Sequence, residues 1–320
     1  MRTPLATRGH RSWIAIAVLV FAGACATTRP AVTNRTPSTA VRHDVAATDG
    51  HTLALWEKRP VAATKRGALL LLHGRTWSSL PNFDLQVAGE RRSLMDAFTA
   101  RGYAVYALDL RGYGATPRDA TGWLTPERAV EDVATALDWI GRRETGQGRP
   151  VLLGLSRGAQ VAAFVAQRHP EKLSAVVLLG YAADLDRKIP STPPDQKPAK
   201  EANTAANAGS DFITPGAISP VAKEAFIAAA LAADPVRSDW RDEDQFNAVD
   251  PAAIKVPVLL IHGEHDPLAT VVKGEKLFAR LGTGDRAWVI IPGADHAVHL
   301  EDAQARLVKA VAGFIERRAP

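Results

Sequence analysis

Residues 151–158 have the sequence VLLGLSRG, and the prediction of the fold starts from them. Its first five residues form an apolar run short enough for a buried strand, and a helical pattern follows it as far as His169. Between the two stands Gly-x-Ser-x-Gly, with Ser156 at its centre. In a strand–turn–helix setting this pattern is typical of a strained turn that projects a serine hydroxyl, and its glycines leave room for the next elements. We predict that Ser156 is a nucleophile; the alternative is a purely structural turn.

Strands and helices alternate on both sides of this turn. Asp49-Gly50 predicts a hairpin, and Thr125 with Pro126 predicts the start of a helix. A further helix is expected around Leu94, and a last one ends near Ile315. This alternation predicts an α/β fold with a mainly parallel sheet and helices on both faces. The strand-like runs are residues 41–47, 52–57, 68–72, 103–110, 151–155, 175–179, 256–261 and 287–291.

The alternation stops between residues 182 and 250. This segment begins with Pro-, Lys- and Asp-rich sequence and contains one clear helical pattern, from Pro220 to Ala233, with Ser219 as its cap. Roughly 70 residues without a strand are too many for an ordinary connection. We therefore predict a helical lid at residues 182–250, inserted into a core formed by residues 41–181 and 251–320.

A serine nucleophile needs a base and an acid that orients the base. The expected chain order is serine, then acid, then histidine. Asp266 follows the strand-like run at 256–261 and His296 follows the run at 287–291. Both therefore lie at the carboxyl ends of strands, where open α/β sheets place their sites. We predict Asp266 as the acid and His296 as the base. The remaining alternatives are Glu264, Asp184 or Asp186 for the acid and His299 for the base, with His265 only a loop residue.

An oxyanion that forms at the substrate carbonyl needs prepositioned donors, each worth about 3–4 kcal/mol when it is removed. We predict the backbone N–H groups of Arg157, directly after the nucleophile, and of Arg75, directly after His73-Gly74. Any residue supplies such an N–H, so the two guanidinium groups have a separate role. They either point to solvent or carboxylates, or they favour a substrate with a negative group.

Four motifs together resemble the α/β-hydrolase superfamily over residues 41–320. They are Leu72-His73-Gly74, the turn at residues 154–158, Gly263 to Asp266 and Gly293 to His296. A fifth, residues 109–114, resembles the family's Asp-x-Arg-Gly-x-Gly turn, in which Asp109 and Arg111 are usually structural. The resemblance implies an eight-stranded sheet, a lid after its sixth strand and no cofactor. Asp295 departs from the family, because many members have glycine there.

A serine at this position, rather than aspartate, favours acyl transfer to water. The first interpretation is a carboxylesterase or lipase-like enzyme that acts on small or medium acyl esters, with Trp77 and Asp184 as substrate-binding candidates. The alternatives are a non-catalytic ligand-binding protein and an aminopeptidase or amidase, similar to proline iminopeptidase. The aminopeptidase needs lid carboxylates to hold the substrate's amino group, and the available ones are Glu201, Asp211, Glu224 and Asp234.

The first 24 residues are typical of a secretory signal: Arg2, Arg8 and Arg11 precede a short apolar run and small residues. The end of this segment resembles a bacterial lipobox, with cleavage before Cys25. We expect residues 1–24 to be removed, lipid on Cys25, a flexible tether at residues 25–40 and a membrane-anchored protein of the bacterial envelope. In the resemblance, the lack of Asp after Cys25 favours the outer membrane. The alternative is ordinary cleavage after Ala24 or Ala26 and a soluble periplasmic or secreted protein.

Composition excludes other classes. Without the three N-terminal arginines, the 39 Lys and Arg residues become 36, against 34 Asp and Glu, so no nucleic-acid surface is expected. The single cysteine excludes an intramolecular disulfide, and no Cys/His cluster has the spacing of a zinc site.

Overall fold

The computed structural model describes Met1, residues 39–60 and residues 66–317. The predicted signal peptide and Cys25 lie outside the described residues, and so does nearly all of the predicted tether. Residues 37–320 form one compact unit. None of the described helices is both long and apolar enough to cross a membrane.

The centre of this unit is an eight-stranded sheet in the order β1-β2-β6-β3-β7-β8-β9-β10. β1 pairs antiparallel with β2, and β2 with β6, whereas all other neighbours in the sheet are parallel. The predicted α/β class and eight strands are confirmed. The strands are β1 (Val41–Ala46), β2 (Thr52–Lys58), β3 (Ala68–Leu72), β6 (Ala104–Leu108), β7 (Val151–Leu155), β8 (Ala175–Leu179), β9 (Val258–Gly263) and β10 (Arg286–Ile291).

Helices cover both faces of the sheet, so β3, β6, β7 and β8 are buried along their whole length. α2 (Leu94–Thr99) and α8 (Gln304–Glu316) pack on one face. α3 (Pro126–Arg143), α4 (Arg157–Arg168) and α7 (Val271–Arg280) pack on the other. The short elements are α1 (Ser79–Phe83), the hairpin β4 (Gln86–Val87) and β5 (Glu90–Arg91), and the single turns η1 (Pro170–Lys172) and η3 (Pro251–Ala253).

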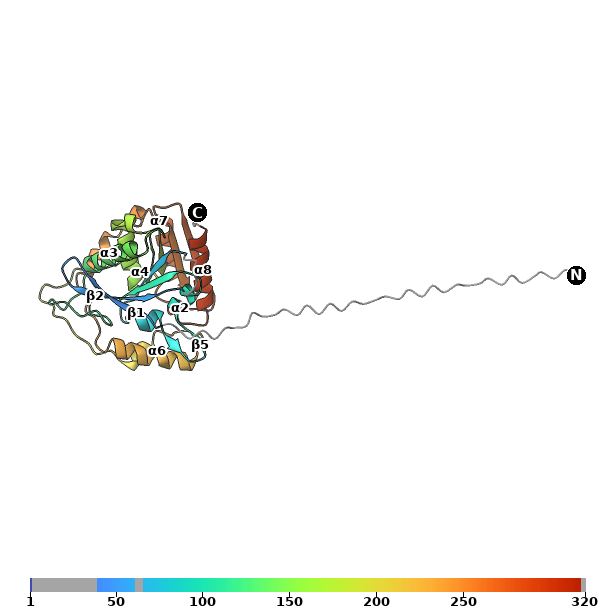
Figure 1. Cartoon of the computed structure of the whole chain (residues 1–320), viewed down its shortest axis with the longest axis horizontal. Coiled ribbons are helices and arrows are strands. Elements are labelled where there is room, and N and C mark those ends of the chain that lie inside the picture. Colours follow the sequence, from blue (N-terminus) through green and yellow to red (C-terminus); the bar gives the residue numbers. More distant parts are fainter. Residues whose placement is uncertain (2–38, 61–65, 318–320) are drawn as a thin grey trace. The chain divides into compact units, whose positions relative to one another are not determined.

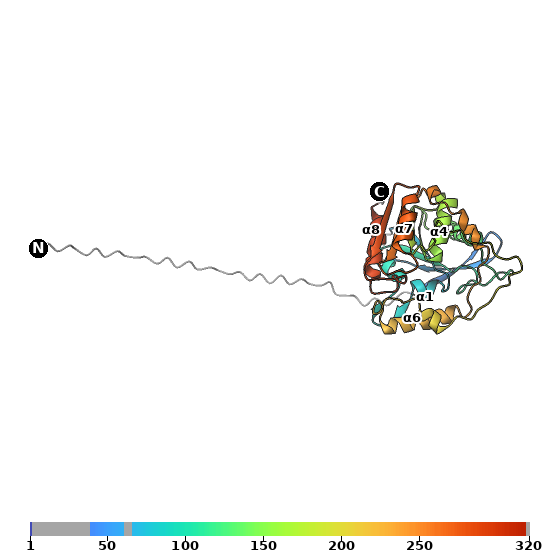
Figure 2. The same cartoon turned by 180° about the vertical axis from the view of Figure 1, so that it is seen from behind.

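The segment between β8 and β9 leaves the sheet, which confirms a helical lid after the sixth strand of the main sheet; we call residues 182–250 the insert. It contains α5 (Ala205–Gly209), α6 (Pro220–Ala233) and the turn η2 (Glu243–Ala248). α6 has the predicted bounds, and Ser219 Oγ caps it by accepting from the Ala222 N–H at 3.1 Å. Figure 1 shows α6 along the lower edge, and Figure 2 shows it from behind, with α1 beside it.

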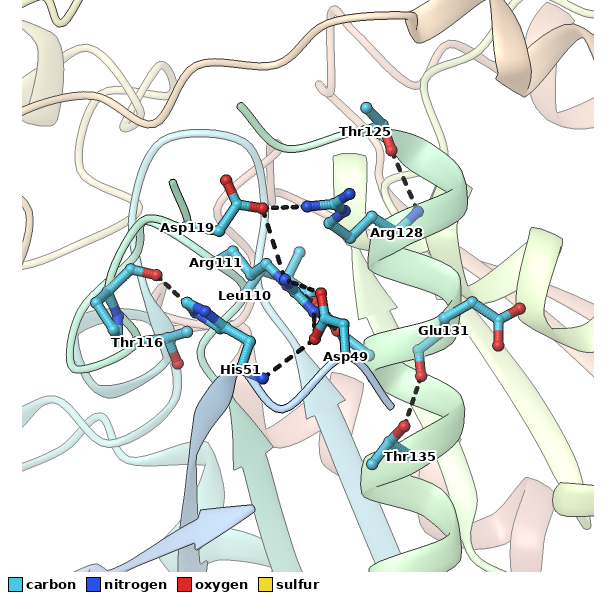
Figure 3. A network of polar contacts seen from close by, with 12 residues as sticks. Asp49, His51, Leu110, Arg111, Thr116, Asp119, Thr125, Arg128, Glu131 and Thr135 are labelled. Carbon is cyan, nitrogen blue, oxygen red and sulfur yellow. Dashed lines mark hydrogen bonds and ion pairs between the residues drawn. The ribbon is translucent and has the colours of Figure 1, made fainter. Parts of the chain in front are cut away.

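The motif at residues 109–114 holds one end of the sheet together. The Arg111 guanidinium donates to Asp49 at 2.7 and 2.9 Å and to Asp132 on α3 at 2.7 Å twice (Figure 3). The hydrogen bond from Arg111 holds the pKa of Asp49 well below its usual range. Asp109 accepts from the Ser79 N–H and the Trp56 indole, both at 2.9 Å. These contacts fix the hairpin turn and the loop after β6 beside the site.

Candidate active site

Ser156 occupies a strained turn between β7 and α4. Its φ of 54° and ψ of −112° form a combination that residues with a side chain rarely adopt. A Cβ at Gly154 would collide with the Gly158 carbonyl, and a Cβ at Gly158 would collide with the carbonyls of Leu72 and His73. The local sequence therefore builds a turn that only glycine permits on either side of the serine.

Asp266 and His296 form a hydrogen-bonded pair. Asp266 Oδ2 lies 2.8 Å from His296 Nδ1, and Asp266 Oδ1 accepts from the N–H groups of Leu268 at 2.8 Å and Ala269 at 2.9 Å. Burial opposes the charge of this carboxylate, but the hydrogen bonds and the histidine hold the pKa of Asp266 below its usual value. Because a carboxylate accepts at Nδ1, we assign the proton to that nitrogen, which leaves Nε2 as the basic one.

Ser156 and His296 each lie next to the end of β8. The Ser156 N–H donates to the Leu179 carbonyl at 2.8 Å. The next residue, Gly180, has a φ of 61°, and a Cβ there would lie 3.0 Å from His296 Cε1. Within the described part of the chain no hydrogen bond joins Ser156 Oγ to His296, a contact that in unliganded enzymes often tightens only with substrate.

The other candidates for acid and base are engaged elsewhere. His299 is buried, its Nε2 lies 3.0 Å from Asn82 Oδ1, and burial lowers its pKa to about 3, so it is neutral. Glu264 accepts from the Gly293 N–H at 3.0 Å. Asp184 and Asp186 pair with Lys276 at 3.6 and 2.7 Å. Asp266 is the one of the four carboxylates with a hydrogen bond to His296.

The two predicted oxyanion donors follow neighbouring strands of the sheet, β3 and β7. Arg75 follows β3, and a Cβ at the preceding Gly74 would lie 3.5 Å from Ser156 Cβ. Arg157 is the first residue of α4, so its N–H is at the positive end of the helix dipole. Among the described residues, neither N–H donates to a backbone carbonyl outside its own element. Both donors are therefore available beside the serine.

The guanidinium groups of these arginines bind the same carboxylate. Glu243 Oε2 in the insert lies 2.7 Å from Arg75 Nη1 and 2.5 Å from Arg157 Nη2. Burial opposes the charge on Glu243, but the two arginines hold its pKa below the usual value. This finding favours the alternative that the two guanidinium groups point to carboxylates, because Glu243 pairs with both.

Two cavities flank this ion-pair cluster. One of about 390 Å³ is lined by Arg157, Tyr181, Asp184 and Phe246, among others. The second, of about 260 Å³, is lined on one side by Arg75. Asp184 therefore lies on a cavity wall, as expected of a substrate-binding candidate.

Trp77 has a different position from the one expected of a pocket residue. It lines neither of these two cavities. It is buried between the core and the insert, where its indole donates to Asp211 Oδ2 at 2.8 Å and packs edge-on against Phe226. Trp77 thus has a packing role in the structure, and its part in substrate binding stays a prediction.

The four insert carboxylates that an aminopeptidase could use to hold an amino group lie in different environments. Asp211 interacts electrostatically with His296, and burial raises the pKa of Asp211 to about 6. Asp234 accepts from the backbone N–H groups of Ser78 at 2.7 Å and Gly114 at 2.8 Å. Glu201 lines the second cavity, and Glu224 is mostly solvent-accessible. Only Asp211 of these four is placed near the predicted base.

Two residues of the site region were missed from the sequence. Glu243 gives no local signal, since its partner Arg75 is 168 positions away. Asp295 did give one, because it stands where a glycine is common. It is fully buried and accepts from the N–H groups of Ile213 at 2.9 Å, Thr214 at 2.6 Å and Ala297 at 3.0 Å. Asp295 thus ties the insert to the loop that carries His296.

The described residues contain no group of three or more His, Cys, Asp or Glu side chains arranged to hold a metal ion. The structure places a serine, a histidine–carboxylate pair and backbone donors after the carboxyl ends of β3, β7, β9 and β10. This is the equipment for nucleophilic acyl transfer.

Comparisons with known proteins agree with the fold. The chain is 25% identical to a monoacylglycerol lipase of Mycolicibacterium smegmatis, over 78% of this chain and 88% of the relative. The structure of a hydrolase from Pseudomonas aeruginosa is 26% identical and superimposes with a TM-score of 0.62, covering 86% of this chain and 98% of that one. The esterase RhEst1 from Rhodococcus is 21% identical with a TM-score of 0.64, over 87% and 99%. The family model described as alpha/beta hydrolase fold matches residues 67–303, so the chain belongs to the alpha/beta hydrolase family.

Proposed function

We propose that this hydrolase is a serine carboxylesterase, lipase-like in its preference for small or medium acyl esters. The observation that carries the proposal is the 2.8 Å hydrogen bond between Asp266 and His296 beside the strained turn of Ser156. A histidine oriented in this way next to a half-buried serine hydroxyl is the arrangement that activates the serine.

In the proposed reaction, Ser156 attacks the ester carbonyl while His296 Nε2 takes the hydroxyl proton. Asp266 keeps the proton on Nδ1 and stabilises the imidazolium. The N–H groups of Arg75 and Arg157 donate to the oxyanion. His296 then protonates the departing alcohol, and water releases the acyl group from Ser156 by the same route.

The similar proteins and one cavity support the proposal that the substrate is an ester. Proteins named monoacylglycerol lipase and esterase are among those to which the chain is similar. The cavity of about 390 Å³ is lined in part by Arg157, the residue after the serine, and both apolar and charged side chains form its walls. Its apolar part offers a surface for an acyl chain. The apolar wall residues are Leu185, Ile189, Phe246 and Val249.

A panel of p-nitrophenyl esters of increasing acyl length tests the proposal. We expect cleavage of short and medium esters, labelling by a fluorophosphonate, and a loss of about 10³-fold or more in kcat for Ser156→Ala. Ser174→Ala, an exposed serine before β8, is the matched control and should keep full activity. Unlabelled, inert protein of native fold would instead favour a ligand-binding role.

An aminopeptidase is the second candidate, and Asp211 is the observation that favours it. This carboxylate lies within electrostatic reach of His296, where a substrate ammonium group could pair with it. Aminoacyl p-nitroanilides separate the two functions. If anilides are cleaved faster than esters, and Asp211→Asn removes that activity while Glu224→Gln does not, the aminopeptidase replaces the esterase.

For localisation, we propose a bacterial envelope lipoprotein with lipid on Cys25, supported by the sequence alone. Expression in a bacterial host with a radiolabelled fatty acid tests this directly. The full chain should incorporate label and fractionate with membranes, and Cys25→Ala should do neither. A labelled-lipid signal that survives in Cys25→Ala would contradict the proposal.

A further inference from the structure

The two proposed oxyanion donors are connected to each other through the insert. Arg75 and Arg157 lie on separate loops, after β3 and β7, and their backbones have no shared element. Their side chains converge on Glu243, at 2.7 and 2.5 Å from the same oxygen atom. One carboxylate therefore connects the loop after β3 with the start of α4, the two segments that carry the proposed N–H donors.

The rest of η2 and the residues before it reinforce this connection. Trp240 Nε1 donates to the Tyr113 hydroxyl at 2.8 Å, and that hydroxyl donates to the Arg75 carbonyl. The Arg157 guanidinium lies over the Phe246 ring, 5.0 Å from its centroid, and over the Trp240 ring at 5.7 Å. Residues 240–246 of the insert thus contact the side chains of both arginines and are linked to the Arg75 backbone through Tyr113.

We propose that Glu243 is a positioning residue for the oxyanion hole: by pairing with both guanidinium groups it holds the Arg75 and Arg157 loops at the separation that the two N–H donors require. This inference rests on the proposed hydrolytic function. It assigns the insert a direct part in transition-state stabilisation, in addition to enclosing substrate.

Electrostatics gives the physical reason. Without the carboxylate, two partly buried cations would face each other and repel. The loops would separate to relieve this repulsion. Oxyanion donors act only within a narrow distance of the developing charge, roughly 2.7–3.1 Å, so a small separation of the loops has a large effect on the rate.

The experiment measures kcat and KM for Glu243→Gln, Glu243→Asp and the neighbouring Asp244→Asn on a neutral ester and on one bearing a carboxylate. Among the described residues, the Asp244 carboxylate accepts one hydrogen bond, from Ser191 Oγ at 2.8 Å, so its variant is the matched control. We expect kcat to fall about 10- to 100-fold in Glu243→Gln for both esters, with KM changed less than about twofold. Glu243→Asp, which keeps the charge, should recover part of kcat.

Two further readouts separate positioning from loss of folded protein. Each kcat is referred to active sites titrated with fluorophosphonate, so that unfolded molecules do not count. Affinity for a trifluoromethyl ketone, which forms an oxyanion adduct, should fall in proportion to kcat/KM, whereas affinity for the alcohol product should not change.

The inference is overturned if Glu243→Gln keeps its kcat, or if it gains activity on the carboxylate-bearing ester alone, which would make Glu243 a gate over two substrate-binding arginines. It is equally overturned if KM rises while kcat is unchanged. Failure of the proposed function looks different, because the wild-type protein itself would then cleave no ester and take no fluorophosphonate label.

Discussion

Two of the attachments between the insert and the core use carboxylates in opposite ways. At the first, Glu243 of the insert binds two core side chains, Arg75 and Arg157. At the second, Asp295 of the core binds the insert's backbone, at the N–H groups of Ile213 and Thr214. The first attachment touches the proposed oxyanion donors, and the second lies next to His296. The same insert therefore supports both halves of the proposed machinery, by ion pairs at one and by backbone capture at the other.

The two attachments also differ in their response to pH. The arginines keep the pKa of Glu243 low, so the first stays charged in the neutral range. The second contains groups that resist ionisation. Burial and a hydrogen bond to the Asp295 carboxylate raise the pKa of Glu301 to about 9, and burial raises that of Asp211 to about 6. We therefore expect the second attachment to weaken as pH rises and the first to remain constant.

The largest expected effect comes from removing Asp295. Asp295→Ala leaves three buried backbone N–H groups without their acceptor, so the free energy of unfolding should fall by about 2–4 kcal/mol. Urea unfolding measures this loss. Asp302→Ala, a mostly exposed carboxylate in the same loop region, serves as the comparison and should lose much less. An unchanged midpoint would show that the second attachment contributes little.

Glu301→Gln tests the pH response of the second attachment. The folded state keeps a proton on Glu301 that the unfolded chain loses above about 4.5, so stability should fall as pH rises from there toward about 9. The glutamine side chain does not titrate and can still donate to Asp295. Its variant should lack this slope and be more stable than wild type by on the order of 2 kcal/mol near pH 8.

Thermal unfolding across this pH range, with the exposed Glu275→Gln as control, provides the measurement. Parallel curves for wild type and Glu301→Gln would contradict a protonated Glu301.

Asp211→Asn should have the smallest effect, and it is stabilising. The pKa of Asp211 is raised from 3.8 to about 6, so wild type loses stability as pH rises through that window. Asparagine removes the buried charge, and its amide oxygen still accepts from Trp77. We expect a gain of about 1 kcal/mol above pH 6 and none near pH 4, measured by urea unfolding. A loss at neutral pH would mean that the charge itself holds the insert.

Most of the fold could be predicted because its signals are local. Eight apolar runs matched eight strands, and Thr125 and Ser219 cap their helices by accepting from the N–H three residues later. The turn at Ser156 was predictable for the same reason, since the glycines that permit its φ stand two positions away on either side.

The roles of long side chains were harder to predict. From the sequence, Arg75 and Arg157 were two cations beside one hole, and Trp77 was a pocket candidate. Their partners, Glu243 and Asp211, lie in the insert, 168 positions from Arg75 and 134 from Trp77. Periodicity carries no information about contacts over such separations.

Backbone preferences and apolar spacing within a few residues were enough to predict the strands, the long helices, the chain order of Ser156, Asp266 and His296, and the turn at the serine. Two contacts of the insert became visible only in the folded molecule: Glu243 joins the segments that carry the two arginines, and Asp295 binds the insert's backbone. Both are contacts of buried charge, and a buried charge is stable only beside the specific partners that the completed fold brings to it.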